Sequence, residues 1–421
     1  MLNAGSSLKV PLYATFNNRM LDIDEDNGVQ TKMTVSYTHD GRSDANAVTQ
    51  PMTIYGKNAI VWSQPNMVGS FVTPKDDTLR DFVRQAFNEN KPSADIINRA
   101  LLTAMTMFDL YTAHGIRYVV DPNSPYSNLS ENSVDYVQFS RETLKFKSGD
   151  CDDLSVLMST ALENLGVETA ILDVPGHLLM MFNTGVLAAE RHQISLNDDL
   201  LVIREGEVWV AVEATMIGTT FLEAWSEGSR KYHEHAAKKK LKAIPMKAAW
   251  AEYAPVTLKP AGYTLVVPDK SQVSPIVVRE KNLLLKKSLD GMVAPYRAMT
   301  RTDPSNIEAR MQVAIIYAKH GLHRAAEREF DAVLEVDPEN SAVYNNRGNI
   351  YFSKQDFERA IESYAYAEQL ASNDAGVKMN LSMAHYKLGD LQMASSKYKE
   401  AQKIDSGVNK KYVGFIKLLN Q

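Results

Sequence analysis

The C-terminal third of the chain carries a repeat with a period of 34 residues, and this repeat constrains the fold more than any other feature. Small residues recur at two positions of each repeat, and an aromatic residue recurs at a third. The three sets are Ala314, Gly348 and Ser382; Ala326, Ala360 and Ala394; and Phe330, Tyr364 and Tyr398. Small residues let helices approach closely and aromatic rings fill the space between units, so we expect stacked helical hairpins from about residue 305.

The period and the small–aromatic pattern resemble the tetratricopeptide repeat, which is a pair of antiparallel helices per unit. The resemblance implies an all-α domain over residues 305–421, with three repeats over about 305–406. It also implies a groove for a peptide or protein partner, faced by Asn346 and Asn380 of the inner helices, with Gln312 at that position in the first repeat. If residues 408–421 fill the groove, the array is a cap instead.

The one cysteine of the chain, Cys151, lies within residues 149–155, which read Gly-Asp-Cys-Asp-Asp-Leu-Ser. Apolar residues at helical spacing follow it, and Gly166 stands where a helix would stop. The pattern therefore predicts a helix with the cysteine at its N-terminus, where unpaired backbone N–H groups and the helix dipole favour a thiolate. The alternative is a small buried side chain, which is what most free cysteines are.

A base and an acid follow the cysteine on expected strands. His177 begins a strand after Pro175-Gly176, and Glu213 ends another strand over residues 207–213. If these strands pair in antiparallel fashion, His177 and Glu213 lie side by side with the cysteine helix packed across them. A cysteine nucleophile needs a base to take its proton and a third group to orient that base. Either residue can instead be structural, as most histidines and edge carboxylates are.

The segments at 149–154, 175–177 and 209–215 resemble the successive Cys, His and acid motifs of the transglutaminase-like superfamily, and more narrowly those of bacterial transglutaminase-like cysteine proteinases. The resemblance covers about residues 80–250 and implies an α+β, papain-like core over residues 76–255. It implies Cys151 as nucleophile, His177 as base and Glu213 as orienting acid. The family usually has Asp in the third position. A longer Glu must be set back to reach the same nitrogen.

Other residues are candidates for supporting roles in this site. Gln138 can supply an oxyanion-hole amide, as the upstream donor of the family does, and Tyr136 is an equal candidate. The backbone N–H of Cys151 is the expected second donor. Asp198 and Asp199 are alternative acids, because they follow the histidine strand in an expected loop.

Three carboxylates flank the cysteine: Asp150, Asp152 and Asp153. They resemble the acidic trio by which some bacterial members of the superfamily hold calcium, and hard oxygen ligands suit Ca²⁺. Simple capping of the helix N-terminus is the alternative, and it is the outcome we expect. No cofactor is expected to be required for the reaction, and Ca²⁺ is the one candidate ion. Three unneutralised acids would make the thiol less nucleophilic.

The rest of the chain sets the domain organisation. Residues 1–75 alternate as β-strands from Leu8 onward and predict a β-sandwich-like segment, while residues 256–304 predict a linker with a docking helix over about 276–297. The net charge of -5 over 421 residues argues against nucleic acid as a partner. No apolar run is long enough to span a membrane.

The expected location is outside the cytoplasm, periplasmic or exported. The first residues lack the basic and apolar regions of a signal peptide, yet they run almost at once into an expected strand, so we expect a longer precursor. A lone cysteine fits the cytosol as well as an exported thiol enzyme. Two functions follow: a thiol enzyme that acts on peptide or isopeptide amides of a protein recruited by the repeats, or a non-catalytic protein-binding scaffold.

Overall fold

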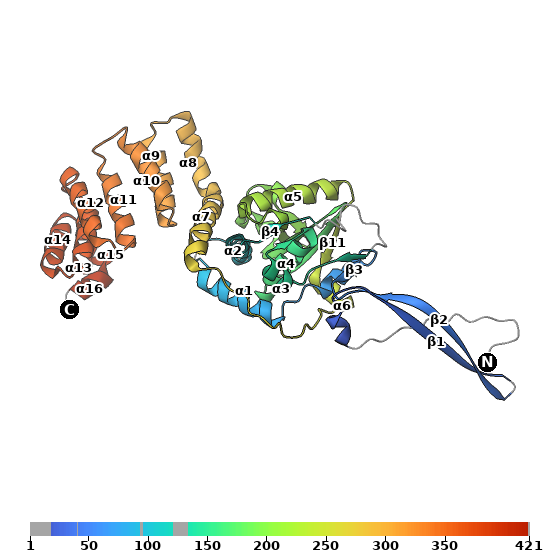
Figure 1. Ribbon diagram of the computed structural model, residues 1–421. Helices are drawn as coiled ribbons and strands as arrows, with labels where there is room; N and C mark the ends of the chain where they lie inside the picture. Colours follow the sequence, from blue (N-terminus) through green and yellow to red (C-terminus); the bar gives the residue numbers. More distant parts are fainter. Residues whose placement is uncertain (1–17, 40, 93–95, 121–133, 420–421) are drawn as a thin grey trace. The chain divides into compact units, whose positions relative to one another are not determined.

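The computed structural model of the chain describes residues 18–39, 41–92, 96–120 and 134–419. It divides into two compact units, Met1–Lys281 and Asn282–Gln421, which are considered separately (Figure 1). Among the described helices, none has the length and apolar character that crossing a bilayer demands.

The first unit is built on an antiparallel sheet of five strands in the order β11-β7-β8-β10-β9. The strands are β7 (Thr169–Val174), β8 (His177–Leu187), β9 (Val202–Arg204), β10 (Glu207–Val212) and β11 (Lys242–Pro245). Tight turns join the consecutive pairs, and Gly176 and Gly206 adopt the positive φ that these turns need. The sheet is not a simple meander, because β10 lies between β8 and β9, and β11 forms the other edge.

Helices cover both faces of this sheet. Successive side chains of a strand alternate between faces, and every residue of β8 from Leu178 to Phe182 is buried. On one face Leu179, Met181 and their neighbours pack with Tyr232 of α5 (Phe221–Ala237). The helix that bears the cysteine, α4 (Cys151–Asn164), packs against β7 and β8 and is buried over its first twelve residues. The cysteine therefore starts the central helix of the core.

Further helices and strands complete the first unit. They are α1 (Asp77–Asn90), α2 (Arg99–His114), β4 (Arg117–Tyr118), β5 (Val134–Tyr136), α3 (Ser140–Phe146), β6 (Ser148–Gly149) and α6 (Met246–Glu252). Two of the strands matter for the site. β4 pairs in parallel with β6, and in this register Tyr118 lies opposite Gly149. The end of α2 is thereby connected to the residues directly before Cys151.

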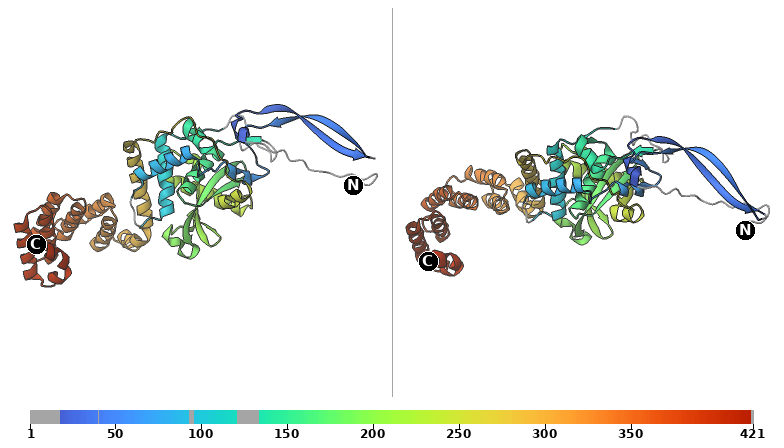
Figure 2. Two further views of the ribbon diagram at one scale, coloured as in Figure 1. Left: turned by 90° about the horizontal axis from the view of Figure 1, so that it is seen from below. Right: turned by 60° about the horizontal axis from the view of Figure 1, so that its bottom comes forward.

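The expected β-sandwich in residues 1–75 is wrong for the described residues. β1 (Asn27–His39) and β2 (Arg42–Ile54) form a two-stranded ribbon with nearly every residue exposed, and β3 (Ala59–Val61) pairs with β5 instead (Figure 2). The expected strand that begins at Leu8 lies outside the described residues. Alternation predicts strands correctly here, but it does not reveal whether a second sheet covers them.

The expected docking helix at 276–297 is two helices, α7 (Lys270–Ser288) and α8 (Asp290–Thr302), which break at Leu289. In the first unit, α7 presents a buried stripe at helical spacing that contains Val273, Val277 and Glu280. The Glu280 carboxylate accepts a hydrogen bond from the backbone N–H of Phe221, at the start of α5.

The second unit contains three helical hairpins in succession, as the 34-residue period predicts (Figure 1). Their helices are α9 (Ile307–Lys319), α10 (His323–Leu334), α11 (Ser341–Ser353), α12 (Phe357–Leu370), α13 (Ala375–Lys387) and α14 (Leu391–Ile404). Gly348 shows why its position stays small, because a Cβ there would lie 2.4 Å from the Tyr364 ring. Two short helices, α15 (Val408–Lys411) and α16 (Val413–Leu419), end the described chain.

Candidate active site

Cys151 is the first residue of α4, as the sequence predicts. Asp150 precedes it as N-cap and accepts a hydrogen bond from the backbone N–H of Asp153. Gly149 is required here, since a Cβ at this position would lie 2.6 Å from the Asp153 Cβ. The thiol is 4% exposed, and the backbone N–H groups of Leu178 and Asp152 point at its sulfur. The thiol therefore lies between the start of α4 and the start of β8.

The surroundings disfavour the thiolate. Burial raises the pKa of the Cys151 thiol, the Asp150 and Glu213 carboxylates add to the effect, and the pKa reaches about 12. The two backbone N–H groups act in the opposite direction but do not compensate. A helix N-terminus alone would lower the pKa of this thiol, so the nearby acids and the lack of solvent reverse that expectation.

His177 and Glu213 meet as the strand positions predict. β8 and β10 pair with Met180 opposite Val212, so His177 and Glu213 become diagonal neighbours on one face where the two strands end. The Nε2 atom of His177 lies 2.8 Å from Glu213 Oε2. The longer Glu side chain thus reaches the imidazole from this backbone position.

The Glu213 carboxylate is buried and is held by several donors. Lys231 Nζ donates to the same oxygen, Oε2, at 2.7 Å, and the backbone N–H and hydroxyl of Thr215 donate to the other oxygen at 3.2 and 2.6 Å. Burial opposes ionisation, but the hydrogen bonds from His177, Lys231 and Thr215 outweigh it and lower the pKa of Glu213 to about 2. Lys231 is a residue that sequence reasoning missed, because only the packing of α5 on β10 brings it to the site.

The link from the cysteine to the histidine stays a prediction. Among the described residues, no hydrogen bond joins the Cys151 sulfur to the His177 ring, and the contact of the thiol with β8 is to the backbone of Leu178. With Nε2 on Glu213, Nδ1 is the ring nitrogen left for the thiol proton. This is the arrangement that a base oriented by an acid requires.

The alternative acids lie elsewhere. Asp198 is exposed and pairs with Arg191 at 2.8 Å, and Asp199 is also exposed. The contact between His177 and Glu213 leaves neither of them a position as the orienting acid.

The two expected oxyanion donors are hydrogen-bonded to carboxylates. Gln138 donates both its backbone N–H and its side-chain amide to the Asp153 carboxylate, at 2.7 Å each. Tyr136 is 40% exposed and donates its hydroxyl to Asp26 at 2.7 Å. Both donors are therefore occupied by carboxylates in this structure.

Tyr118 is a phenol at the site that sequence reasoning missed. Partial burial raises the pKa of its phenol, and so do the charges of Cys151, Asp150 and Glu213, which places the hydroxyl near the thiol. A phenol kept protonated is an available O–H donor. The signal in the sequence is weak, because β4 has two residues and no periodicity to mark it.

The acidic trio both caps the helix and converges. Asp150, Asp152 and Asp153 are buried, and each offers a carboxylate oxygen within 4.8 Å of the others. Helix capping is present, as expected, in the reciprocal hydrogen bonds of Asp150 and Asp153. Asp152 Oδ2, however, is buried without a hydrogen-bond partner among the described residues. Capping therefore does not account for all three acids.

A fourth buried acid, Asp135, adds to this group. It accepts a hydrogen bond from Trp62 at 2.7 Å, and burial raises its pKa. Burial and then the Asp150 charge raise the pKa of Asp153 to about 7, and burial likewise raises the pKa of Asp152. Such a group of acids suits either shared protons or a hard cation.

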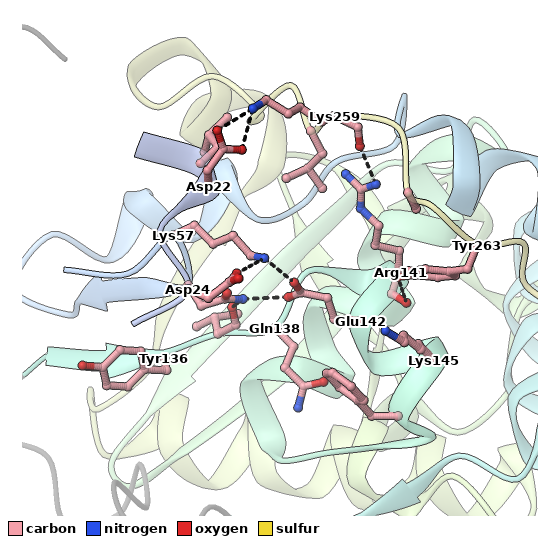
Figure 3. A pocket seen from close by; sticks show the side chains of 16 residues that line it. Asp22, Asp24, Lys57, Tyr136, Gln138, Arg141, Glu142, Lys145, Lys259 and Tyr263 are labelled. Atoms are coloured by element: carbon pink, nitrogen blue, oxygen red, sulfur yellow. Dashed lines mark hydrogen bonds and ion pairs between the residues drawn. The ribbon is translucent and has the colours of Figure 1, made fainter. Parts of the chain in front are cut away.

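A cavity of about 610 Å³ lies beside this region and is lined by Gln138 but not by Cys151 (Figure 3). Ion pairs line it: Lys57 joins Asp24 and Glu142 at 2.7 and 3.2 Å, and Lys259 pairs with Asp22 at 2.5 Å. These pairs connect the residues that flank the β1–β2 ribbon to α3 and to the segment after α6. The wall of the cavity therefore has a structural role in the first unit.

In the second unit, the two expected partner-binding residues are joined to neighbouring asparagines. Asn380 donates to Asn345 at 2.9 Å, while Asn346 donates to the backbone of its own helix and accepts weakly from Asn349. These amides form a polar patch on α11 and α13. No described residue of α15 or α16 contacts Asn346 or Asn380 by a hydrogen bond.

The C-terminal segment packs instead on the last repeat. Val408, Tyr412 and Phe415 pack around Met379 and Ala401 of α13 and α14. In the part of the chain that the structure describes, α15 and α16 therefore cover the end of the array.

Comparison with known proteins identifies the repeats. Residues 314–375 match the model of the tetratricopeptide repeat. Similar solved structures include the crystal structure of MamA, with 22% identity over 32% of this chain and 77% of that chain and a TM-score of 0.27. PilF of Pseudomonas aeruginosa is another, with 20% identity over 31% of this chain and 57% of that chain and a TM-score of 0.24.

These likenesses are low in identity and TM-score, and they carry no argument about function. A search of curated proteins finds no match to the chain. The family match covers residues 314–375, which is only part of the second unit. The chain is thus an α/β unit joined to an array of tetratricopeptide repeats.

Proposed function

We propose that the first unit is a transglutaminase-like thiol enzyme that acts on peptide or isopeptide amides by acyl transfer. The observation that carries this proposal is the hydrogen bond of 2.8 Å between His177, the first residue of β8, and a buried Glu213 directly after β10. Two of the three residues proposed for the triad touch, and the backbone N–H of Leu178, the residue after His177, points at the sulfur of the third.

The proposed reaction has two steps. The Cys151 sulfur attacks the amide carbonyl carbon, and its proton passes to His177 Nδ1. The C–N bond then breaks, the amine leaves with that proton, and the acyl group stays on sulfur. Water or a second amine, deprotonated by the same imidazole, resolves the thioester and regenerates the thiol. Glu213 holds the imidazole by Nε2 and stabilises its charged form.

The oxyanion of the tetrahedral intermediate needs donors. The backbone N–H groups of Asp152 in α4 and of Leu178 in β8 point at the sulfur, and the Tyr118 phenol stays protonated nearby. We assign the donor role to these groups in place of Gln138 and Tyr136, whose donors are held by Asp153 and Asp26.

The thiol pKa of about 12 is the main obstacle to this activity. The acids near the sulfur cause part of it, so a cation among them would lower the pKa. Asp150, Asp152 and Asp153 fit a calcium ion in charge and ligand type, and the unpartnered Oδ2 of Asp152 supplies a free ligand atom. We propose that these three residues hold Ca²⁺, whose positive charge would favour the thiolate.

The repeats would bring a protein to this unit. Tetratricopeptide repeats commonly bind peptides or proteins, and the asparagines of α11 and α13 offer amide donors and acceptors for an extended backbone. We propose that this polar patch recruits a protein that is the substrate or its carrier. An exported enzyme that acts on other proteins is consistent with this arrangement.

The test uses the full chain with dye-labelled casein, in calcium and in EDTA. Release of dye-labelled peptides reports hydrolysis, and incorporation of a fluorescent primary amine into casein reports transfer. We expect one of these activities in the native protein and none in Cys151→Ala or His177→Ala. Activity that survives in both variants would refute the assignment.

The alternative is a non-catalytic scaffold that retains the fold. The raised thiol pKa favours this reading, because a buried neutral thiol is inert. The scaffold hypothesis predicts the same slow rate of Cys151 alkylation in calcium and in EDTA. The enzyme hypothesis predicts a faster rate in calcium.

A further inference from the structure

Three consecutive residues beside the cysteine expose large side chains. The exposed fractions are 43% for Tyr118, 54% for Val119 and 51% for Val120. The run begins in β4, which follows α2 and pairs with β6. Scattered exposed apolar residues are ordinary on protein surfaces. This run is different because it adjoins the candidate nucleophile.

One edge of the backbone of this run has no strand paired with it among the described residues. Arg117 and Val119 donate their N–H groups to Lys147 and Gly149 of the β6 side, at 3.0 and 2.9 Å. Alternate residues of a strand direct their N–H and C=O groups to opposite edges, so those of Tyr118 and Val120 face away from β6. Among the described residues, no second strand pairs with that edge.

The free edge leads to the sulfur. Tyr118 lies opposite Gly149, two residues before Cys151, and its phenol feels the charges of Cys151 and Asp150. A chain that paired with this edge would therefore carry one of its amides toward the nucleophile. The surface is continuous with the proposed catalytic site.

The acidic groups around the site limit which side chains a bound polypeptide can carry. The carboxylates of Asp150 and Glu213 lie near the Cys151 sulfur, and the charge of Asp152 raises the pKa of the Tyr118 phenol. An acidic side chain next to the reacting amide would be repelled by these groups. Apolar side chains, in contrast, would bury the exposed valines.

We infer that the edge of residues 118–120 binds the substrate as an added β-strand and selects an extended, apolar, non-acidic polypeptide segment around the reacting amide. Backbone hydrogen bonds to Tyr118 and Val120 give affinity, and contacts with the exposed side chains give the preference for apolar residues. The inference rests on the proposed function for its meaning, but the binding it predicts does not require catalysis.

The experiment measures binding to the full-length Cys151→Ala protein, which cannot react. The probe is a fluorescein-labelled peptide amide of alternating valine and alanine, and two analogues carry aspartate or asparagine in place of valine. Fluorescence anisotropy gives each Kd, with calcium and with EDTA. We expect the valine peptide to bind at least about tenfold more tightly than the aspartate peptide.

A variant pair locates the site. Val120→Pro removes the N–H that faces the free edge, and Val120→Thr keeps it in a side chain of similar shape. We expect Val120→Pro to raise the Kd about tenfold, as loss of one backbone hydrogen bond would, and Val120→Thr to raise it about threefold or less. Ile203→Thr, at an exposed apolar position of β9, should leave the Kd unchanged.

Three results would overturn the inference: no preference among the peptides, no binding up to millimolar concentration, or equal binding by Val120→Pro and Val120→Thr. Thermal unfolding of each variant excludes loss of the fold as the cause. Failure of the proposed function would look different, because the peptide would then bind normally while Cys151 of the native protein stayed unreactive.

Discussion

Replacement of Glu213 by glutamine should destabilise the first unit by a measurable and pH-dependent amount. Glu213 is 1% exposed and accepts hydrogen bonds from His177, Lys231 and Thr215. Glutamine keeps the shape and one acceptor oxygen but removes the negative charge. Lys231 then loses its partner, and the His177 ring loses the anion that orients it.

The magnitude follows from the pKa. Folding lowers the pKa of Glu213 from 4.5 to about 2, which corresponds to about 3 kcal/mol in favour of the folded state when the group is ionised. Because the folded pKa is the lower one, this stabilisation is present above about pH 4.5 and is lost as the pH falls toward about 2. Glu213→Gln should therefore cost about 2–4 kcal/mol near pH 7 and progressively less below pH 4.5.

Urea unfolding of the full chain at several pH values measures this difference. Glu234→Gln is the matched control, since Glu234 is a side chain of α5 that is 39% exposed and pairs with Lys238 and Arg230. It should change stability by about 0.5 kcal/mol or less. If Glu213→Gln were no more costly than Glu234→Gln near pH 7, the description of Glu213 as a buried, held anion would be refuted.

Three further predictions concern other parts of the first unit. Calcium should raise the unfolding midpoint and speed alkylation of Cys151 near pH 7, and EDTA should reverse both; an unchanged midpoint and rate would exclude an ion at the acidic trio. Burial, with the nearby Glu280, raises the pKa of Asp109 to about 8, so native stability should fall from about pH 4 to about pH 8. Asp109→Asn should lose that part of the pH dependence in urea unfolding, and an identical profile would contradict it. Gly228→Ala should cost about 1–3 kcal/mol, because its Cβ would lie 2.6 Å from the Ala211 oxygen, whereas Gly262→Ala, with open space around it, should cost less than about 1 kcal/mol in the same assay.

Local patterns predicted the parts of the fold that depend on them. Apolar spacing and Gly166 predicted α4, alternation with Pro175-Gly176 predicted β7 and β8, and the 34-residue period predicted the hairpins of the second unit. The meeting of His177 with Glu213 followed from pairing two strands whose ends the sequence marks. Each of these inferences used residues that are close in sequence or joined by a regular ladder.

The rest depended on competition among groups distant in sequence. Gln138 is upstream of the cysteine, as an oxyanion donor would be, but its side-chain amide donates a hydrogen bond to Asp153. Lys231 contacts Glu213 only because α5 packs on the sheet, and Tyr118 lies near the thiol only because β4 pairs with β6. Apolar and polar residues alternate in β1 and β2 as they would in a β-sandwich, yet both faces of this ribbon are exposed. The periodicity of apolar residues does not predict which of several distant groups a side chain contacts.

Acylation of Cys151 tests the central claim most directly. The full-length protein is incubated with p-nitrophenyl acetate in calcium, and mass spectrometry of its peptides locates the acetyl group over time. The proposed site predicts rapid acetylation of Cys151 in the native protein, slow acetylation in His177→Gln, and loss of the acetyl group when hydroxylamine or an amine is added. Acetylation of Cys151 at the same slow rate in the native protein and in His177→Gln would contradict a nucleophile activated by this imidazole.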